Sequence, residues 1–274
     1  LPVPMTGRTP LLDHPLNSPT AFSPQELVNA VRRERQLEAT PIPEVCVLEF
    51  DGDLTDWLVS SRRAKVCRSW SCFHTTMYSY QVGGVECGIV PRTIGGPYAV
   101  LIAEQMAVSG ARVVLGLTSA GRVSRRMPIP GLVVATRAIR DEGTSLHYVP
   151  PASTIDAAKH VAGRLLEELE GMTVPVLTGT VWTTDAPYRE TAEQLAGHSK
   201  AGALAVEMQA ASLFAFSRAR RFPVGLVAHV TNGVGDQKNK EFDKGSRELQ
   251  VEVLRRICRA GERYLSSTKG QNLV

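Results

Sequence analysis

The chain has 274 residues, of which 43% are hydrophobic and 21% charged, an ordinary composition for a soluble globular protein with a full core. No apolar run is long enough to span a bilayer, and the Pro-rich start lacks a signal-peptide core, so we expect a cytoplasmic protein with no membrane partner. The formal charge of +4 comes from scattered basic residues, which fits small anions at least as well as nucleic acid.

The five cysteines show no CxxC pair and no metal-ligand spacing, so we expect no bound metal. Cys46, Cys87 and Cys258 lie in apolar surroundings, which is typical of buried thiols in a reducing compartment. Among the histidines, His229 closes an apolar run and is expected to be a satisfied core imidazole.

The first third of the chain alternates between turn formers and periodic segments. Residues 1–22 are rich in Pro and have no period, which predicts an extended arm. A capping box at Ser23 to Glu26 opens a helix to about Ala39. Further on, we expect a buried strand at Val45–Phe50, a hairpin at 75–82 and 85–90, and a helix between Gly95 and Gly110.

The alternation of strands and helices continues to the end of the chain. Strands are predicted at Arg112–Leu117, Leu132–Ile139, Val174–Trp182, Ala203–Val206 and Val224–Val230, and helices at Ser153–Glu170, Met208–Arg221 and Glu241–Tyr264. This order predicts a central sheet covered by helices on both faces. No composition shift suggests a linker, so residues 23–274 are expected to form one domain of the α/β class.

Segments that follow strands are expected to converge on one rim of such a sheet. Several of them place Gly beside Ser or Thr, which lets backbone N–H groups and hydroxyls approach a small polar ligand. They are 51–53, 92–96, 118–121, 140–145, 183–185 and 231–233. The chain contains no GxGxxG after the first strand, no P-loop, no GxSxG and no HExxH, so dinucleotide and P-loop sites are excluded.

The most informative segment is the one in which a small-residue strand meets a helix at Glu207, Met208 and Gln209. A carboxylate at the carboxyl end of a strand can accept hydrogen bonds from two vicinal hydroxyls, which suits a sugar better than a phosphate. An acidic residue in the first turn of a helix also favours the helix dipole, and the residues alone leave both interpretations open.

Taken in order, these segments resemble the nucleoside phosphorylase superfamily, in particular its uridine phosphorylase and nucleosidase branches. The resemblance runs from about Val45 to Tyr264. Its most specific parts are Thr93-Ile94-Gly95-Gly96-Pro97, residues 140–148 (Arg-Asp-Glu-Gly-Thr-Ser-Leu-His-Tyr), residues 179–185 (Gly-Thr-Val-Trp-Thr-Thr-Asp) and Val206-Glu207-Met208. It implies a three-layer α/β/α sandwich with a mixed, barrel-like central sheet, and cleavage of the N-glycosidic bond of a nucleoside by phosphate or water.

The resemblance also implies roles for individual residues, with Glu207, Asp185 and Asn232 in catalysis. Glu207, Met208 and Gln209 would line the ribose, and His14 would contact its 5′ end across a subunit interface. Gly95, Thr118 and Ser119 would line the nucleophile side. The base would lie near Thr184, Tyr188, Arg189 and Glu190, with Asn232 beside its leaving edge. Phosphate would be a co-substrate rather than a cofactor, and the assembly would be a homodimer or homohexamer.

The sequence departs from the family where the anion should bind. The family's phosphate turn, Gly-Asp-Pro-x-Arg, is replaced by Phe50-Asp51-Gly52-Asp53-Leu54, and the acids are expected to repel an anion. Three arginines that usually hold phosphate are absent from their places. Each such charge-assisted bond contributes about 1.5–3 kcal/mol, so another cation must substitute, and Arg92, with Arg122 second, is the candidate.

Further departures from the family leave two points undetermined, the identity of the base and the choice between phosphate and water as the nucleophile. Gln209 replaces a Glu of the family's Glu-Met-Glu, and Asn232 replaces the Asp that protonates purines, which leaves 6-oxopurine or pyrimidine bases. Thr118 to Gly121 look more like the nucleosidase branch, in which a carboxylate activates water, and Asp51 or Asp53 could take that role. Three hypotheses follow: a nucleoside phosphorylase, a hydrolytic nucleosidase, and a nucleoside-binding protein that has lost its anion site.

Overall fold

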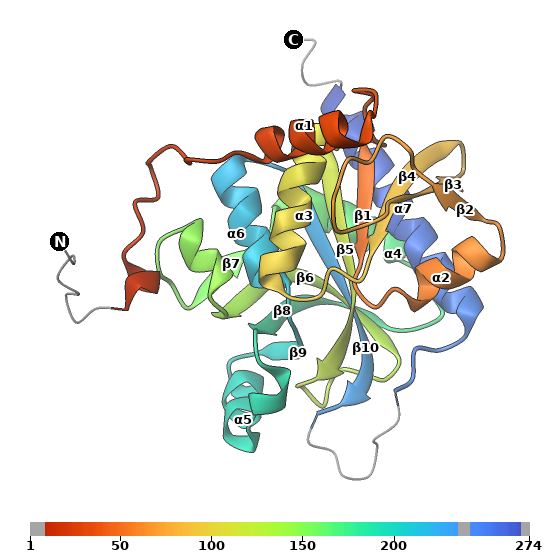
Figure 1. Ribbon diagram of the computed structural model, residues 1–274. Coiled ribbons are helices and arrows are strands. Elements are labelled where there is room, and N and C mark those ends of the chain that lie inside the picture. The colour runs from red at the N-terminus through yellow and green to blue at the C-terminus, as the bar shows by residue number, and fades with distance from the viewer. Residues whose placement is uncertain (1–8, 235–241, 270–274) are drawn as a thin grey trace, which may run out of the picture.

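A ten-stranded mixed sheet lies at the centre of the computed structural model, which describes residues 9–234 and 242–269 (Figure 1). Its strands are β1 Val45–Glu49, β2 Ala64–Val66, β3 Tyr78–Val82, β4 Val85–Pro91, β5 Val113–Arg122, β6 Gly131–Asp141, β7 Thr154–Asp156, β8 Val176–Thr184, β9 Ala203–Glu207 and β10 Val224–Gly233. The α-helices are α1 Pro24–Arg35, α2 Asp53–Ser60, α3 Gly96–Ser109, α4 Lys159–Leu169, α5 Ala192–Lys200, α6 Ala210–Arg220 and α7 Arg247–Lys269, and short 3₁₀ turns occur at η1 Pro10–Leu12, η2 Thr144–His147 and η3 Pro187–Arg189.

Half of the sheet closes on itself. The strands follow the order β10-β6-β8-β9-β5-β1-β4-β3-β2, and β10 also pairs with β5 in parallel. The strands β5, β10, β6, β8 and β9 therefore form a ring, which is the barrel-like centre that the resemblance implied. The parallel strands β1, β5 and β10 end at one rim. Strand β9 runs antiparallel to β5 but pairs with it near the carboxyl ends of both strands, Gly121 with Val206 and Arg122 with Ala205, so its carboxyl end meets the same rim.

Helices cover both faces of the sheet, so the predicted three-layer α/β/α fold is confirmed. One apolar cluster contains residues of α3 and α6 together with Leu48 and Leu226, and α1 packs on α3. The other cluster packs α4 and α7 against the opposite face through Val47 and Leu115. Figure 1 shows α1, α3 and α6 on one side of the strands and α4 and α7 on the other. Cys46, Cys87 and Cys258 are buried, as predicted.

Local sequence signals account for the starts of two helices. The capping box of α1 is confirmed, because the Ser23 hydroxyl accepts from the Glu26 N–H and the Glu26 carboxylate accepts from the Ser23 N–H. At α2 the buried carboxylate of Glu49, the last residue of β1, accepts hydrogen bonds from the N–H groups of Gly52 and Thr55. Glu49 therefore holds the acidic turn in a fixed conformation.

Several predicted boundaries were wrong for tertiary reasons. The helix expected at 153–170 begins only at Lys159, because Thr154–Asp156 pairs with β6 as a strand and buries Ile155. Helix α1 ends four residues early, where Gln36 adopts a left-handed conformation with φ of 53°. Strand β5 continues five residues past Leu117, and α2, α5 and β2 had not been predicted. The expected start of the last helix at Glu241 lies outside the described residues, and α7 begins at Arg247.

Candidate active site

The carboxyl ends of β5, β9 and β10 meet at a cavity of about 570 Å³. This volume lies within the usual range for small-molecule sites. Residues that the sequence placed on the ribose, nucleophile and base sides come together in its wall. The predicted residues among its lining are Asp51, Thr118, Ser119, Tyr188, Glu190, Glu207, Met208, Gln209 and Asn232.

Glu207 ends β9 and lies almost completely buried in the cavity wall. Its Oε2 accepts hydrogen bonds from the N–H groups of Gln209, at 2.6 Å, and Ala210, at 2.8 Å, and its Oε1 accepts from the Thr183 hydroxyl at 2.5 Å. Burial raises the pKa of Glu207 to about 7, although these three donors lower it. The carboxylate thus caps the start of α6, as one interpretation of the sequence held, and Oε1 can still accept a second hydrogen bond.

Gln209 continues this corner and connects it to β5. Its side-chain oxygen accepts hydrogen bonds from the Met208 N–H at 3.2 Å and the Thr118 hydroxyl at 3.3 Å. The amide nitrogen of Gln209 is a donor, and the side chain as a whole is 2% exposed. The corner therefore combines a carboxylate acceptor with an amide donor, which is the pattern needed to hold a diol.

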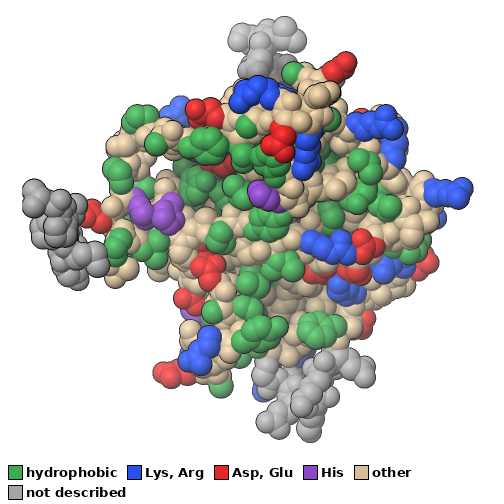
Figure 2. Space-filling view, in the orientation of Figure 1, with side chains coloured by type: hydrophobic (Ala, Val, Ile, Leu, Met, Phe, Trp, Pro, Cys, Tyr) green, Lys and Arg blue, Asp and Glu red, His purple; other side chains and the backbone are tan. Residues whose placement is uncertain are grey.

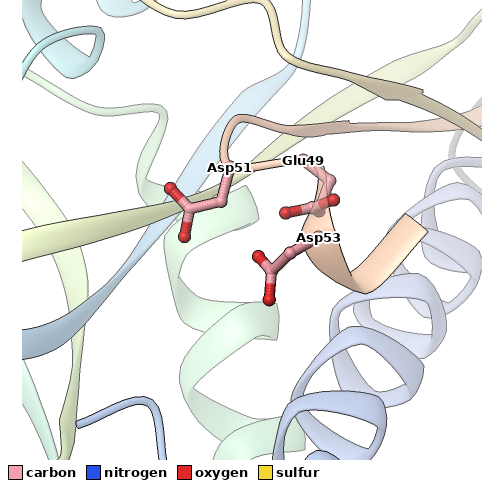
Figure 3. A group of neighbouring side chains, drawn as sticks. All are labelled: Glu49, Asp51 and Asp53. Carbon is pink, nitrogen blue, oxygen red and sulfur yellow. The ribbon is translucent and has the colours of Figure 1, made fainter. Parts of the chain in front are cut away.

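The acidic turn after β1 closes the cavity on the side of Ser119. Figure 3 shows the carboxylates of Glu49, Asp51 and Asp53 gathered around this turn, and their ligand atoms lie within 4.8 Å of one another. Ser119 donates a hydrogen bond to Asp51 Oδ1 at 2.7 Å, and Lys244 Nζ lies 2.8 Å from Asp51 Oδ2 and 2.8 Å from Asp53 Oδ1. The lysine ammonium thus occupies the position between the two aspartates that a bound cation would take.

The same lysine favours the ionised form of Asp53. Burial tends to raise the pKa of Asp53, but the hydrogen bond to Lys244 and the charges of Lys244 and Arg247 lower it below its usual value. Asp53 faces these cations and does not belong to the described lining of the 570 Å³ cavity. Of the two aspartates in this turn, Asp51 is therefore the one that both lines the cavity and pairs with Lys244.

The base side of the cavity is formed after β8 and at the end of β10. Asn232 Oδ1 accepts a hydrogen bond from the Thr231 hydroxyl at 3.2 Å, which leaves its amide nitrogen as a donor. Tyr188 is 98% exposed at the rim, near Phe242, and burial raises the pKa of Glu190. Figure 2 shows hydrophobic side chains gathered over the ends of β9 and β10, while basic and acidic side chains are interspersed over the rest of this face.

Arg92, the sequence-based candidate for an anion anchor, lies outside the described lining of the cavity. Its backbone is left-handed, with φ of 62°, and its side chain packs over Gly52. The guanidinium pairs with Asp56 on α2 and is 52% exposed. Pairing with Asp56 therefore directs Arg92 away from the nucleophile side.

Other predicted residues lie outside the described lining of the cavity. Asp185 Oδ2 accepts from the Gly143 N–H at 2.9 Å, and the Thr184 hydroxyl accepts from the Ala186 N–H. Burial raises the pKa of Asp185, while the Gly143 N–H lowers it. Gly95 is the N-cap of α3 with φ of 91°, and Arg189 ends the exposed turn η3.

Two predicted histidines have surroundings that the sequence did not indicate. His14 stacks on His147 of the same chain, with ring centroids 4.0 Å apart, so within the chain the arm lies over η2. His229 is buried, but its Nε2 has no hydrogen-bond partner among the described residues. The imidazole is therefore buried, as the sequence indicated. A small cavity of about 20 Å³, which Asp51, Asp53 and Lys244 also line, lies beside the ring.

Lys244 is a site residue that sequence reasoning missed, whereas Thr183 lies in the predicted rim segment 183–185 but was given no role of its own. Thr183 is fully buried, donates to Glu207 and accepts from the Ala211 N–H at 3.0 Å, so it fixes the start of α6. Its position beside the predicted Thr184 was the available signal. Lys244 follows the end of β10 by eleven positions and carries no local motif.

A larger groove, of about 970 Å³, lies elsewhere, against the start of β1 and the β3–β4 hairpin. Its lining includes Val45, the first residue of β1, and therefore the amino end of that strand. Ligands of α/β sheets bind at the carboxyl ends of the strands, and two of the three predicted catalytic residues, Glu207 and Asn232, line the smaller cavity. We therefore assign the site to the smaller cavity.

Known proteins share this architecture. The model of the phosphorylase superfamily matches residues 56–265. The guanosine phosphorylase of Halorubrum lacusprofundi is 29% identical over 182 residues, which cover 64% of this chain and 74% of that protein. The uridine phosphorylase of Thermococcus kodakarensis is 31% identical over 115 residues, 42% of this chain and 40% of the relative. The crystal structure of a purine nucleoside phosphorylase from Toxoplasma gondii superposes with a TM-score of 0.70 at 15% identity, covering 83% of this chain and 95% of that one, and shows the same fold.

Proposed function

Because the chain belongs to the phosphorylase superfamily, we propose that it is a nucleoside phosphorylase that releases a free base and ribose 1-phosphate. Phosphate attacks C1′ of the nucleoside as the N-glycosidic bond breaks. The observation that carries the proposal is one cavity that gathers the acid-and-amide corner, the Thr118–Ser119 pair and Asn232. Its volume of about 570 Å³ leaves room for a nucleoside and a small anion.

The ribose lies against Glu207 and Gln209 in this proposal. The free acceptor capacity of Glu207 Oε1 takes one hydroxyl of the sugar, and the amide nitrogen of Gln209 donates to another. Breaking the glycosidic bond develops positive charge on the sugar ring, as in glycoside hydrolysis. The ionised carboxylate of Glu207 stabilises that charge from a preorganised position, because three donors already hold it in place.

The departing base lies between Tyr188 at the rim and Asn232 at the end of β10. The amide nitrogen of Asn232 donates to a nitrogen or carbonyl of the base and stabilises its developing negative charge without transferring a proton. The ring of Tyr188 offers a face on which a base can stack. The relatives act on guanosine or uridine by name, which is compatible with a 6-oxopurine or a pyrimidine leaving group.

The reaction requires phosphate as co-substrate and no further cofactor in this proposal, and the protein works as a homodimer or homohexamer. None of the described helices combines the length and the apolar character that crossing a membrane requires. Basic and acidic side chains alternate on the face in Figure 2, which favours a small-molecule substrate over nucleic acid.

Hydrolysis is a second candidate function, and one observation favours it. The carboxylate of Asp51 lines the cavity beside Ser119, and none of the described lining residues carries a positive charge. A carboxylate in that position can accept a proton from an attacking water molecule. In that case the products are a free base and free ribose.

A panel of purine and pyrimidine nucleosides, incubated with and without phosphate, tests the proposal through the free base and the sugar product. We expect base release and ribose 1-phosphate only when phosphate is present. Base release with free ribose in the absence of phosphate would establish hydrolysis instead. The variant Glu193→Gln, on the exposed face of α5, is a control that keeps full activity. No base release from any nucleoside under either condition would contradict both functions.

A further inference from the structure

Phosphorolysis needs a positive charge near the attacking anion, and none of the described residues of the cavity wall carries one. The described lining residues are neutral or acidic, and Arg92 is paired with Asp56. Lys244 is a cation in direct contact with the wall, because its Nζ lies 2.8 Å from Oδ2 of the lining residue Asp51. Its side chain is 28% exposed and is therefore not locked in the core.

A small cavity connects Lys244 to the nucleophile side. Asp51, Thr118 and Ser119 line both the 570 Å³ cavity and the cavity of about 20 Å³ behind them, which Lys244 and the buried His229 also line. The small cavity has room for about one water molecule. The Asp51 carboxylate and the hydroxyls of Thr118 and Ser119 therefore lie between the ammonium and the place where phosphate would bind.

The surrounding contacts leave each aspartate with a hydrogen-bond partner when Lys244 turns away from Asp51. Asp53 keeps Arg247, whose Nη1 lies 3.4 Å from Asp53 Oδ2, and Asp51 keeps the hydrogen bond from Ser119. The backbone remains beside the site, because the N–H of Asp243 donates to the Thr231 carbonyl at 2.7 Å. A lysine ammonium on a flexible four-carbon stem can change partners with little movement of the chain.

We propose that Lys244 is the cation of the phosphate subsite, and that its ammonium exchanges Asp51 Oδ2 for an oxygen of the bound phosphate. This assignment rests on the proposed phosphorolysis. Lys244 remains paired with Asp53 during the exchange, Ser119 continues to donate to Asp51, and the Thr118 hydroxyl can turn to the same anion. The two aspartates of the acidic turn then hold the Lys244 ammonium in position for phosphate rather than repel the anion.

Kinetics of Lys244→Met test the proposal. Losing one charge-assisted hydrogen bond to phosphate raises the apparent KM for phosphate by about 10- to 100-fold, with the KM for the nucleoside changed by less than about threefold. Lys244→Arg retains most of the phosphate affinity. The matched control Lys200→Met, at the exposed end of α5, behaves as the wild type.

The double variant Lys244→Met/Asp53→Asn distinguishes a direct contact between Lys244 and phosphate from a role in which Lys244 only neutralises the aspartates. It removes the ammonium but restores the net charge of the turn. We expect its KM for phosphate to remain as high as that of the single variant. A return to the wild-type value would show that Lys244 only screens the acids, and an unchanged KM in Lys244→Met would likewise overturn the proposal.

Binding of inorganic phosphate provides a readout that does not depend on turnover. We expect millimolar phosphate to raise the Tm of the wild type and of Lys200→Met but not that of Lys244→Met. If phosphate stabilises the wild type through Lys244 while no nucleoside is cleaved, the proposed function fails and the subsite stands. If phosphate stabilises the wild type and Lys244→Met equally, or stabilises neither, the subsite assignment fails.

Discussion

Replacing Glu207 by Gln separates the charge of the ribose corner from its shape. The amide oxygen can remain with the N–H groups of Gln209 and Ala210, and the amide nitrogen can donate to the Thr183 hydroxyl. The variant therefore keeps the packing of a buried residue and loses only the negative charge. Because that charge faces the oxocarbenium-like sugar, we expect turnover to fall at least tenfold, which corresponds to about 1.4 kcal/mol.

The same substitution has a stability effect whose sign depends on pH. Burial raises the pKa of Glu207 from its usual 4.5 to about 7, so the folded protein disfavours the ionised form. The contribution of Glu207 to the free energy of unfolding is greatest below pH 4.5. It falls by roughly 3 kcal/mol in total as the pH rises to about 7. Gln carries no such dependence. The free energy of unfolding of the variant, relative to that of the wild type, should therefore rise by about 2–3 kcal/mol between pH 5 and pH 8.

Urea unfolding of both proteins at pH 5 and pH 8, with activity measured across the same range, checks both expectations. Activity of the wild type should decline below pH 7 as Glu207 becomes protonated, and Glu207→Gln should lack that acidic limb. The exposed variant Glu193→Gln controls for the loss of any one carboxylate. Undiminished turnover in Glu207→Gln, or the same dependence of unfolding free energy on pH in both proteins, would refute the reasoning.

Three further substitutions probe the surroundings of the cavity. Arg92→Ala should leave the KM for phosphate within twofold and lower the free energy of unfolding by at most about 1 kcal/mol, because the arginine pairs with Asp56 in solvent. A large increase in the KM for phosphate would instead identify Arg92 as the anion anchor. Gly96→Ala should destabilise the fold by about 1–3 kcal/mol, since a Cβ there would lie 2.1 Å from Ser212 Oγ, and an unchanged Tm would contradict this contact. Tyr188→Ala should raise the nucleoside KM by about two- to tenfold without changing the Tm, because its ring is 98% exposed; equal KM values would remove Tyr188 from the base site.

The parts of the fold that the sequence predicted depend on local signals. The capping box of α1, the Gly83-Gly84 hairpin and the alternation of strands with helices each lie within a few residues of chain. The cavity was predictable for a related reason. The parallel strands β5 and β10 end at one rim, so the polar residues after them meet wherever the alternation is correct. Strand β9 runs antiparallel to β5, and its carboxyl end reaches that rim through the β5–β9 pairing, which the alternation does not predict.

What the sequence did not predict depends on contacts between distant segments. Thr154–Asp156 looked like the first turn of a helix, but pairing with β6 made it a strand. Arg92 stands next to the glycine loop and looked like the substitute anchor, but its left-handed backbone and Asp56 direct it into solvent. The contact between Lys244 and Asp53 joins positions 191 residues apart, and such a pair leaves no periodic or local pattern.

The acidic turn shows why a site's electrostatics must be taken from the assembled chain. In sequence, Asp51 and Asp53 indicate a negative loop that repels anions. In the structure, Lys244 and Arg247 balance the two aspartates, and one carboxylate faces the cavity with an ammonium directly behind it. An anion that approaches this wall meets a charge pair that can rearrange, rather than a fixed negative charge. Affinity for phosphate is then determined by how readily Lys244 exchanges partners, so neutralising Asp51 should strengthen phosphate binding only while Lys244 is present.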